Sequence, residues 1–446
     1  MTKNMTIGPP WQLIVSFALP LIIGNMFQQF YNMADSFIVS RTIGTGALAA
    51  VGSTGSINFL ILGFMIGFTQ GASIVTAQRF GAGDERGVRR SFACGILLSA
   101  VITAVLMAVS IISLKSLLRL LNTPEEIVSD AYIYMITILW GMPAITLFDI
   151  CSNMMRAVGD SRTPLYFLVI ACIINIILDY IFILVFGMGV FGAGLATVIA
   201  QLTSGVLCIP AIFKRIKVLC VTKDDWKLRR NELWDQARAA LPLGFQLSII
   251  AIGALAVSFA VNKLGTIPVA AFTTGQRIDQ FAGMPLSSIG AAMTTYTAQN
   301  FGAKKIGRIR KGVFQGGLIA FGLALLIGIL FIAGGRTLAR IFLKEAAAVG
   351  LAKSYLTIQG ACFIMLGQLF VYRQTLLGLG NSIVPTISGV VELIMRIVTA
   401  LALAIPFGFI GICFASPLAW AGGLIPLVIS LVFTLKRLRL KELSGR

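Results

Sequence analysis

Asp35 is the first acidic residue of the chain, and it lies near the end of an apolar stretch, 12–40, that is long enough to cross a bilayer as a helix. Because a carboxylate inside a membrane is costly, we expect Asp35 to face the protein interior or a water-filled cavity, as a candidate functional residue. The alternative is a carboxylate at the membrane rim, solvated by interfacial water. Gln28, Tyr31 and Asn32 precede it and are candidates for lining a substrate cavity.

Two further polar pairs have the spacing of one helical turn. Asp149 and Asn153 are four residues apart, share a helix face and are candidates for a cavity that attracts cations. Alternatively, Asp149 forms a salt bridge with Arg156. Glu392 and Arg396 have the same spacing, which favours an internal ion pair that lowers the cost of both charges in the membrane.

Several polar residues of the second half are candidates for the same central cavity. Gln246 is the strongly polar side chain of one apolar stretch, and Gln276 and Arg277 lie in the next. Arg277 and Asp279 do not share a helix face, so each needs another partner. Arg373 precedes a glycine-containing turn and is expected to anchor a cytoplasmic helix end.

The composition excludes several kinds of chemistry. The chain has no histidine, so Ser–His and Cys–His nucleophiles are excluded and a zinc site is not expected. Six of the seven cysteines lie in apolar stretches and are expected to pack as free thiols, and Cys220 lies in a basic loop. The G-x-x-x-x-G-K-[ST] phosphate loop is absent, so ATP is not bound by that route. The sequence therefore predicts a protein that is not an enzyme and needs no cofactor.

Hydropathy predicts an all-α polytopic membrane protein, since 57% of the residues are hydrophobic and only 12% are charged. The net charge of +19 comes from short basic clusters between apolar stretches, a pattern typical of cytoplasmic loops rather than of nucleic-acid binding. We predict twelve spans, at 12–38, 47–78, 91–121, 131–155, 164–186, 192–213, 238–264, 267–300, 311–343, 350–377, 383–405 and 410–435.

The distribution of Lys and Arg predicts the topology. Basic residues gather in alternate connections, among them 79–90, 214–238 and 304–311, and in the C-terminal tail. Both termini are therefore expected in the cytoplasm. The N-terminus lacks the charged region and cleavage site of a removable signal peptide, so the first span is expected to direct insertion. We expect the chain in a bacterial inner membrane, as a monomer in the lipid bilayer.

The chain also repeats itself. Thr76-Ala77-Gln78-x-Phe80-Gly81-Ala82 recurs as Thr297-Ala298-Gln299-x-Phe301-Gly302-Ala303, an offset of 221 that also relates GDSRTP to GNSIVP. Because each repeat holds six spans, we expect two lobes related by a pseudo-twofold axis along the membrane normal. The predicted division is 1–219 for the first lobe, 220–232 for a cytoplasmic linker and 233–446 for the second lobe. Such two-lobed bundles are typical of alternating-access transporters.

At four places the sequence resembles the multidrug and toxic compound extrusion (MATE) family, in its DinF-like branch. The motifs are ALPLIIGNMFQQFYNMADSFIVS, VTAQRFGAGDERGVRR, RAVGDSRTPLYF with IINIILDYIF, and GVFGAGLATVIAQ, and the resemblance covers essentially the whole chain. It implies a secondary active multidrug antiporter that exports small amphipathic, often cationic, organic compounds in exchange for H+ or Na+.

The resemblance also implies a set of cation-coupling residues in the first lobe. The family pattern of the first span falls on Asp35, the Asn-x-x-x-Asp pattern on Asn175 and Asp179, and the G-A-x-x-A-T pattern on Thr197. Asn175 and Asp179 share one helix face. For Asn175 and Thr197, hydrogen bonding between helices is the alternative role. Another branch of the family has acidic residues in the seventh and tenth spans, and these are missing here.

The coupling ion and the activity stay open at this point. The coupling residues offer two carboxylates, an amide oxygen and a hydroxyl, which suit Na+; no other metal ion is expected. Two neighbouring carboxylates also suit a proton carrier. A lipid-linked oligosaccharide flippase of related architecture is an alternative, since Arg277, Arg373 and Arg396 could form a cationic cavity. A receptor or scaffold that binds a ligand without moving it is another.

Overall fold

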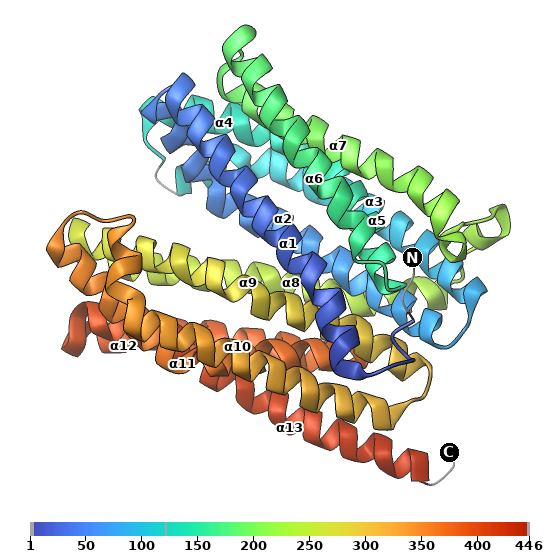
Figure 1. The fold of residues 1–446 in the computed structure, drawn as a ribbon. Helices are drawn as coiled ribbons and strands as arrows, with labels where there is room; N and C mark the ends of the chain where they lie inside the picture. Colours follow the sequence, from blue (N-terminus) through green and yellow to red (C-terminus); the bar gives the residue numbers. More distant parts are fainter. Residues whose placement is uncertain (1–3, 121–122, 444–446) are drawn as a thin grey trace. The chain divides into compact units, whose positions relative to one another are not determined.

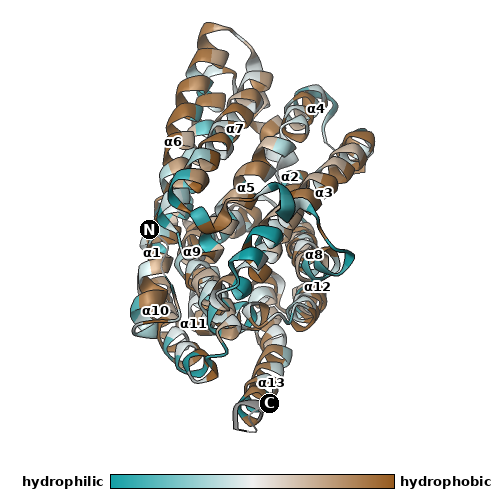
Figure 2. Cartoon of the chain, turned by 90° about the vertical axis from the view of Figure 1, so that its right-hand side faces the viewer, coloured by the Kyte–Doolittle hydropathy of each residue, from teal (hydrophilic) through white to brown (hydrophobic). Residues whose placement is uncertain are grey.

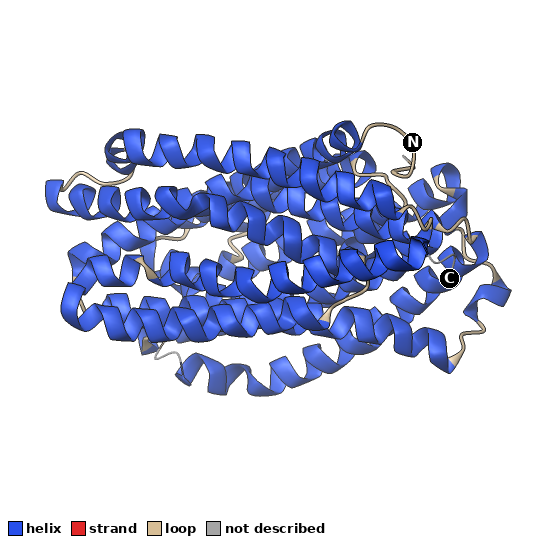
Figure 3. Ribbon diagram, turned by 90° about the horizontal axis from the view of Figure 1, so that it is seen from below, coloured by secondary structure: helices blue, strands red, loops and turns tan. Residues whose placement is uncertain are grey.

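The computed structural model describes residues 4–120 and 123–443, and within them all regular secondary structure is helical (Figure 3). The first half contains α1 (Pro10–Thr42), α2 (Thr45–Gly81), α3 (Glu85–Leu120), α4 (Glu125–Trp140), α5 (Met142–Ala157), α6 (Arg162–Asp179) and α7 (Gly189–Arg215). The second half contains α8 (Arg230–Asn262), α9 (Thr266–Gly302), α10 (Ile306–Arg340), α11 (Ala346–Gly378), α12 (Ile383–Cys413) and α13 (Ala415–Leu443). A π-helix, η1 (Tyr180–Val185), follows α6, and two 3₁₀ turns, η2 (Lys217–Leu219) and η3 (Lys223–Trp226), join α7 to α8.

The prediction of an all-α polytopic membrane protein is confirmed. Among the described residues, ten helices are long and apolar enough to cross a membrane, and α4 with α5 forms an eleventh candidate. α9 is long enough, but polar side chains such as Gln276, Arg277 and Asp279 keep it out of this set. With α9, the helices match the twelve predicted spans, and apolar residues dominate most of them (Figure 2).

Two predicted spans differ in detail from the observed helices. The span predicted at 131–155 consists of α4 and α5, which meet at Gly141 with a bend of 48°. Pro143 begins α5, where its missing N–H costs no helical hydrogen bond. The span predicted to end at 405 continues to Cys413, with one non-helical residue, Gly408, at a φ of +53° that favours glycine.

Contacts divide the chain into two compact units that do not coincide with a cut at the linker. Unit 1 contains Pro20–Ser248, and unit 2 contains Met5–Leu19 and the chain from Ile249 onward. α1 therefore begins in unit 2 and continues into unit 1 from Pro20, whereas α8 passes from unit 1 into unit 2 after Ser248. The predicted division into lobes at 1–219 and 233–446 follows the duplication rather than the packing, and it stays a prediction.

The start of the chain is bound to the repeated motif within unit 2. The backbone N–H of Met5 donates to Gln299 Oε1 (2.9 Å), and Asn300 Nδ2 donates to the Met5 carbonyl (3.1 Å). Lys305 Nζ donates to the Thr6 carbonyl at 3.0 Å. These polar contacts fix the segment that leads into α1, and they explain why the first turns of α1 belong to unit 2.

In unit 1 the start of α8 is bound by residues of α2 and α3 next to the other copy of the motif, whose Thr76 hydroxyl is hydrogen-bonded to that of Ser91 (2.8 Å). Gln236 Nε2 donates to the carbonyl of Ala72 (2.7 Å), and Ser91 Oγ donates to Gln236 Oε1 (3.0 Å). Small residues allow the two backbones to meet, since a Cβ on Gly67 would lie 2.4 Å from the carbonyl oxygen of Leu243. In each unit, the beginning of the helix that opens the other repeat is thus bound at a copy of the motif or next to it.

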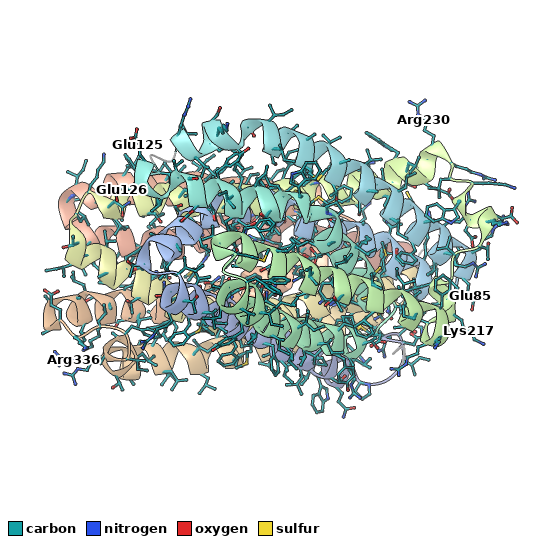
Figure 4. The ribbon with its side chains drawn as sticks, turned by 90° about the horizontal axis from the view of Figure 1, so that it is seen from above. Glu85, Glu125, Glu126, Lys217, Arg230 and Arg336 are labelled. Atoms are coloured by element: carbon teal, nitrogen blue, oxygen red, sulfur yellow. The ribbon has the colours of Figure 1, made fainter. Side chains whose placement is uncertain are left out.

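Within each unit the later helices pack side by side. α6 and α7 are neighbours in unit 1, and α10, α11 and α13 are neighbours in unit 2 (Figure 1). In unit 1, Glu125 and Glu126 lie at one end, and Glu85, Lys217 and Arg230 lie at the opposite end (Figure 4). These five charged side chains therefore mark the two polar ends of unit 1 (Figure 4).

Asp225 organises the linker between α7 and α8. Its Oδ2 accepts hydrogen bonds from the backbone N–H (2.9 Å) and the hydroxyl (2.7 Å) of Thr222 and forms an ion pair with Arg89 (3.1 Å). Burial by itself would raise the pKa of Asp225, but the Thr222 hydrogen bonds and the Arg89 charge outweigh it, so the pKa lies below its usual value. The ionised form therefore stabilises the linker.

Asp225→Asn is expected to loosen this linker. A pKa that is lower in the folded protein gives stability that is present above the ordinary Asp pKa and is lost as the pH falls through the lowered value. Losing hydrogen bonds to a charged group costs about 1.5 kcal/mol or more, so we expect amide hydrogen exchange across 222–229 to accelerate roughly tenfold at neutral pH. The neighbouring Asp224→Asn is the control, because Asp224 is exposed and pairs only with the exposed Lys227. Equal exchange in both variants would contradict this role of Asp225.

Candidate cation-binding site

The candidate site is formed where α6 ends. Asp160 receives hydrogen bonds from the backbone N–H groups of Arg162 (3.1 Å) and Thr163 (3.0 Å), which satisfies donors at the start of α6. α6 then runs to Asp179, and the chain continues as the π-helix η1. π-helical turns occur frequently at functional sites, because the inserted residue shifts the side chains around it.

Asp179 and Asp35 form a buried pair of carboxyl groups. Asp179 is fully buried and Asp35 is 8% exposed. The two carboxyl groups lie within hydrogen-bonding range of each other, although α1 and α6 are far apart in sequence. A hydrogen bond between two carboxyl groups needs a proton on one of them. In addition, Oδ1 of each residue is buried without a partner among the described residues.

Asn175 and Thr197 lie beside this pair. With the Asn175 amide oriented so that both of its ends are satisfied, its nitrogen donates to Asp179 Oδ2 (3.1 Å) and its oxygen accepts from the backbone N–H of Thr197 (3.1 Å). The Thr197 hydroxyl donates to the carbonyl of Ala193 (3.1 Å) and accepts from the hydroxyl of Tyr31 (3.2 Å). α1, α6 and α7 thus each supply polar groups to one place in unit 1.

A tyrosine from a fourth helix completes the surroundings. Tyr134 of α4 is buried and is an electrostatic neighbour of both Asp35 and Asp179. α7 can approach α4 here because a Cβ on Gly194 would already lie 3.1 Å from the Cβ of Thr137. The sequence analysis did not single out Tyr134, since one hydroxyl in an apolar helix gives no signal of its neighbours.

The arrangement can hold either a proton or a small hard cation. The unpartnered Oδ1 atoms of Asp35 and Asp179 offer lone pairs, and the hydroxyls of Tyr31 and Thr197 lie beside the Asn175 amide. Oxygen ligands of this kind suit Na+, and a carboxyl pair suits H+. Within residues 4–120 and 123–443, no three Cys, Asp or Glu side chains gather as a metal site of another kind would require.

The predicted pair Asp149 and Asn153 lies elsewhere in unit 1. Asn153 Nδ2 donates to the Thr69 hydroxyl (3.1 Å), and Asn153 Oδ1 accepts a long contact from Arg156 Nη1 (3.5 Å). Asp149 is an electrostatic neighbour of Arg156, but Asp149 Oδ2 is buried without a hydrogen bond in the described part of the chain. The salt bridge considered for these two residues is therefore not formed.

The remaining cavity candidates are dispersed over both units. Gln28 and Asn32 are exposed on α1, Gln246 is buried in α8, Gln276 is partly exposed and Arg277 is exposed on α9. Tyr31, also predicted to line the cavity, lies beside the carboxyl pair of Asp35 and Asp179, where its hydroxyl donates to Thr197.

The predicted internal pair of Glu392 and Arg396 is wrong. Glu392 forms a buried ion pair with Arg373 of α11, and Ser388 Oγ donates to Glu392 Oε1 (3.3 Å). Arg373 is consequently a buried partner of Glu392 rather than an exposed anchor at a helix end. The reason is packing, since α11 and α12 bring the two charges into direct contact, whereas the i and i+4 spacing only permits a pair along one helix.

Comparisons with known proteins agree with this architecture. The sequence profile of the MatE family matches residues 20–181 and 242–401, one block in each repeat. The "Probable multidrug resistance protein YoeA" of Bacillus subtilis is 26% identical over 397 residues, which cover 87% of this chain and 85% of that protein. A "FAD transporter" of Shewanella oneidensis is 26% identical over 382 residues, covering 83% of this chain and 82% of that protein.

A solved structure has the same fold. It is described as the outward-facing conformation of a multidrug resistance MATE family transporter of the MOP superfamily. It aligns with a TM-score of 0.90 at 23% identity and covers 98% of each chain.

Proposed function

The chain belongs to the MatE family of membrane transporters, and we propose that it is a secondary active exporter of amphipathic organic compounds, driven by inward movement of H+ or Na+. As a member of a transporter family it is not an enzyme. The observation that carries the proposal is the buried carboxyl pair of Asp35 and Asp179, because ionisable groups inside a membrane commonly mark ion pathways.

In this proposal, Asp35, Asn175, Asp179 and Thr197 bind the coupling cation. A cation or proton relieves the repulsion and the missing hydrogen bonds of the two buried carboxylates. α1 carries Asp35 in unit 1 while its first turns, up to Leu19, pack in unit 2. Ion binding at Asp35 therefore acts on a helix that belongs to both units, and Pro20 lies where α1 passes from one to the other. An ion that binds two conformations differently shifts their populations, which is the requirement for coupling.

The substrate class rests on the surface of α1 and on the relatives. Met26, Phe27, Phe30 and Met33 are exposed next to the polar Gln28 and Asn32. Flexible methionine and aromatic surfaces accommodate varied amphipathic molecules. Together with the name of the Bacillus relative, this supports export of several different drugs. We further propose that these drugs are mainly cationic and that they move by alternating access. Gln246, Gln276, Arg277, Asp149 and Asn153 stay candidates for substrate contacts.

The proposed location is the inner membrane of a bacterium, with both termini in the cytoplasm. The basic connections of the chain support this orientation, because Lys and Arg gather on the cytoplasmic side of membrane proteins. In unit 1, Lys217 and Arg230 lie at the end opposite to Glu125 and Glu126 (Figure 4).

The proposal is tested by efflux of a fluorescent organic cation from liposomes that contain the purified protein. An imposed pH gradient and an imposed Na+ gradient are compared, with protein-free liposomes as the blank. We expect efflux under one of the two gradients, which identifies the coupling ion. Absence of efflux under both gradients would overturn cation-coupled export of organic cations and direct attention to lipid-linked substrates.

The flippase alternative has less support than it had from sequence. It needs a set of free cationic side chains, and of the three arginines considered for it Arg373 is paired with Glu392, which leaves Arg277 and Arg396. The receptor or scaffold alternative predicts binding without any gradient-dependent flux, so the same liposome experiment separates it from transport.

A further inference from the structure

The two repeats place residues of different charge at the same position of the fold. α11 begins 221 residues after α4, and α12 begins 221 residues after α6, so both pairs keep the offset of the repeat. This offset carries Asn175 onto Arg396 and Asp179 onto Ala400. Unit 2 therefore has a guanidinium where the candidate cation site has an amide, and it has no carboxylate at the position of Asp179.

A second tyrosine and a glycine support the correspondence in space. The offset carries Tyr134 onto Tyr355, which is buried and is an electrostatic neighbour of Arg396, just as Tyr134 is of Asp179. α1 and α8 share Ala-Leu-Pro at an offset of 222, which carries Tyr31 onto Gly253. A Cβ on Gly253 would lie 3.5 Å from Nη1 of Arg396, so Gly253 lies directly against it.

Gly253 thus packs closely against Leu393 and Arg396, since an added Cβ would lie 3.3 Å from Leu393 Cδ1. In unit 1 the Tyr31 phenol fills the equivalent place and donates to Thr197. The 222-residue offset also carries Asp35 onto Val257. Both acidic residues of the candidate cation site thus have apolar equivalents in unit 2, and an arginine replaces Asn175. The charged neighbours of Arg396 in unit 2 are Glu392, Arg373 and Asp279.

Asp279 of α9 lies near Arg396, but the two side chains do not pair. They are electrostatic neighbours, yet in the described part of unit 2 they form no hydrogen bond and no ion pair within 4.0 Å. Asp279 Oδ1 and Arg396 Nε are both buried without a partner. Each side chain nevertheless keeps part of its surface exposed, so a ligand can reach it.

This differs from the neighbouring ion pair of Arg373 and Glu392. Those two side chains are in direct contact, and the Ser388 hydroxyl lies against both of them. The two charges of that pair compensate each other directly, although Arg373 Nε is also buried without a hydrogen bond among the described residues. Arg396 and Asp279 instead keep unused hydrogen-bonding groups at a membrane depth where each one costs free energy, so a molecule that satisfies both is favoured.

We propose that Arg396 and Asp279 form a two-point ligand site in unit 2 for amphipathic molecules that carry a carboxylate or similar anion next to an ammonium group. The planar guanidinium binds the anion, since its N–H groups match the two oxygens of a carboxylate. The ammonium donates to Asp279 Oδ1. This inference rests on the proposed export function, because it assigns a class of substrate to the exporter.

Three matched fluorescent probes test the inference by binding to the full-length protein in detergent, without any gradient. Nε-dansyl-lysine carries both charges, dansylcadaverine has the same chain with the ammonium alone, and dansyl-6-aminohexanoate has the carboxylate alone. We expect Nε-dansyl-lysine to bind the wild-type protein most tightly. Arg396→Gln should weaken its binding, and that of the hexanoate, by at least about tenfold and leave dansylcadaverine within about twofold. Arg336→Gln, which removes an exposed arginine of α10, is the control.

The reciprocal variant and the contrary outcomes complete the test. Asp279→Asn should weaken Nε-dansyl-lysine and dansylcadaverine but not the hexanoate, which a merely structural role would not produce. The inference is overturned if wild-type protein binds no carboxylate probe, or if Arg396→Gln weakens all three probes equally. Efflux of dansylcadaverine under a cation gradient reports the proposed function separately. That efflux can persist when the two-point site fails, and carboxylate binding can persist when efflux fails.

Discussion

Replacing Asp35 or Asp179 with asparagine is expected to lower gradient-driven efflux by at least about tenfold, which corresponds to ~1.4 kcal/mol. Asparagine keeps the size and the hydrogen-bonding reach of the side chain, but it neither carries a negative charge nor exchanges a proton. The two carboxyl groups lie within hydrogen-bonding range of each other, so they should act as one unit. We therefore expect the double variant to be no worse than either single variant. Initial efflux rates in liposomes measure all three.

The control for this prediction is Glu126→Gln, which removes an exposed carboxylate at the end of unit 1. Its efflux should match that of the wild-type protein. Gel filtration and circular dichroism of each variant show whether the fold is kept. Full efflux in either single variant, or a double variant whose loss equals the sum of the two single losses, would contradict a shared site.

Glu392→Gln is expected to destabilise unit 2 by about 3–5 kcal/mol, the usual effect of leaving a buried charge without its partner. Arg373 is 5% exposed, and the neutral amide of glutamine would leave the charge of its guanidinium uncompensated. A lower midpoint of thermal unfolding in detergent and a lower yield of monodisperse protein would measure the effect. Glu392 also packs directly against the backbone of Gly423, since a Cβ added at Gly423 would lie 2.7 Å from Glu392 Cγ. Little room is left for a larger side chain at position 392.

The double variant Arg373→Met with Glu392→Gln distinguishes a charge effect from a packing effect. It removes the unpaired cation, so most of the lost stability should return. A double variant as unstable as Glu392→Gln would show that the ion pair itself is not what stabilises this part of unit 2.

Hydropathy was sufficient to predict the spans because membrane insertion depends on local composition. The span at 267–300 was also predicted, and it corresponds to α9, although α9 is not among the helices that qualify as candidate spans by hydropathy. The bend between α4 and α5 was not predicted, since Pro143 gives the start of a helix as readily as a kink within one. The sequence also did not predict that α1 begins in unit 2 and that α8 begins in unit 1. This packing depends on side-chain contacts such as that of Gln236 with Ala72.

The candidate site shows the same limit. Asn175 and Asp179 could be assigned to one helix face from their spacing, and the family motifs pointed to Asp35 and Thr197. Their meeting in one place, and the contribution of Tyr134, required the packing of four helices. The predicted pairing of Glu392 with Arg396 failed for the related reason that spacing along one helix gives no information about charges on neighbouring helices, here Arg373 of α11.

The most direct measurement of coupling is cation movement driven by substrate alone. Liposomes that contain the protein are loaded with a fluorescent organic cation and diluted into substrate-free buffer, and the internal pH or the uptake of labelled Na+ is followed. The account predicts that outward substrate flow draws one of these cations inward through the wild-type protein, and that Asp35→Asn abolishes this movement. Substrate flow without any cation movement in the wild-type protein would contradict a coupling role for the Asp35 and Asp179 pair.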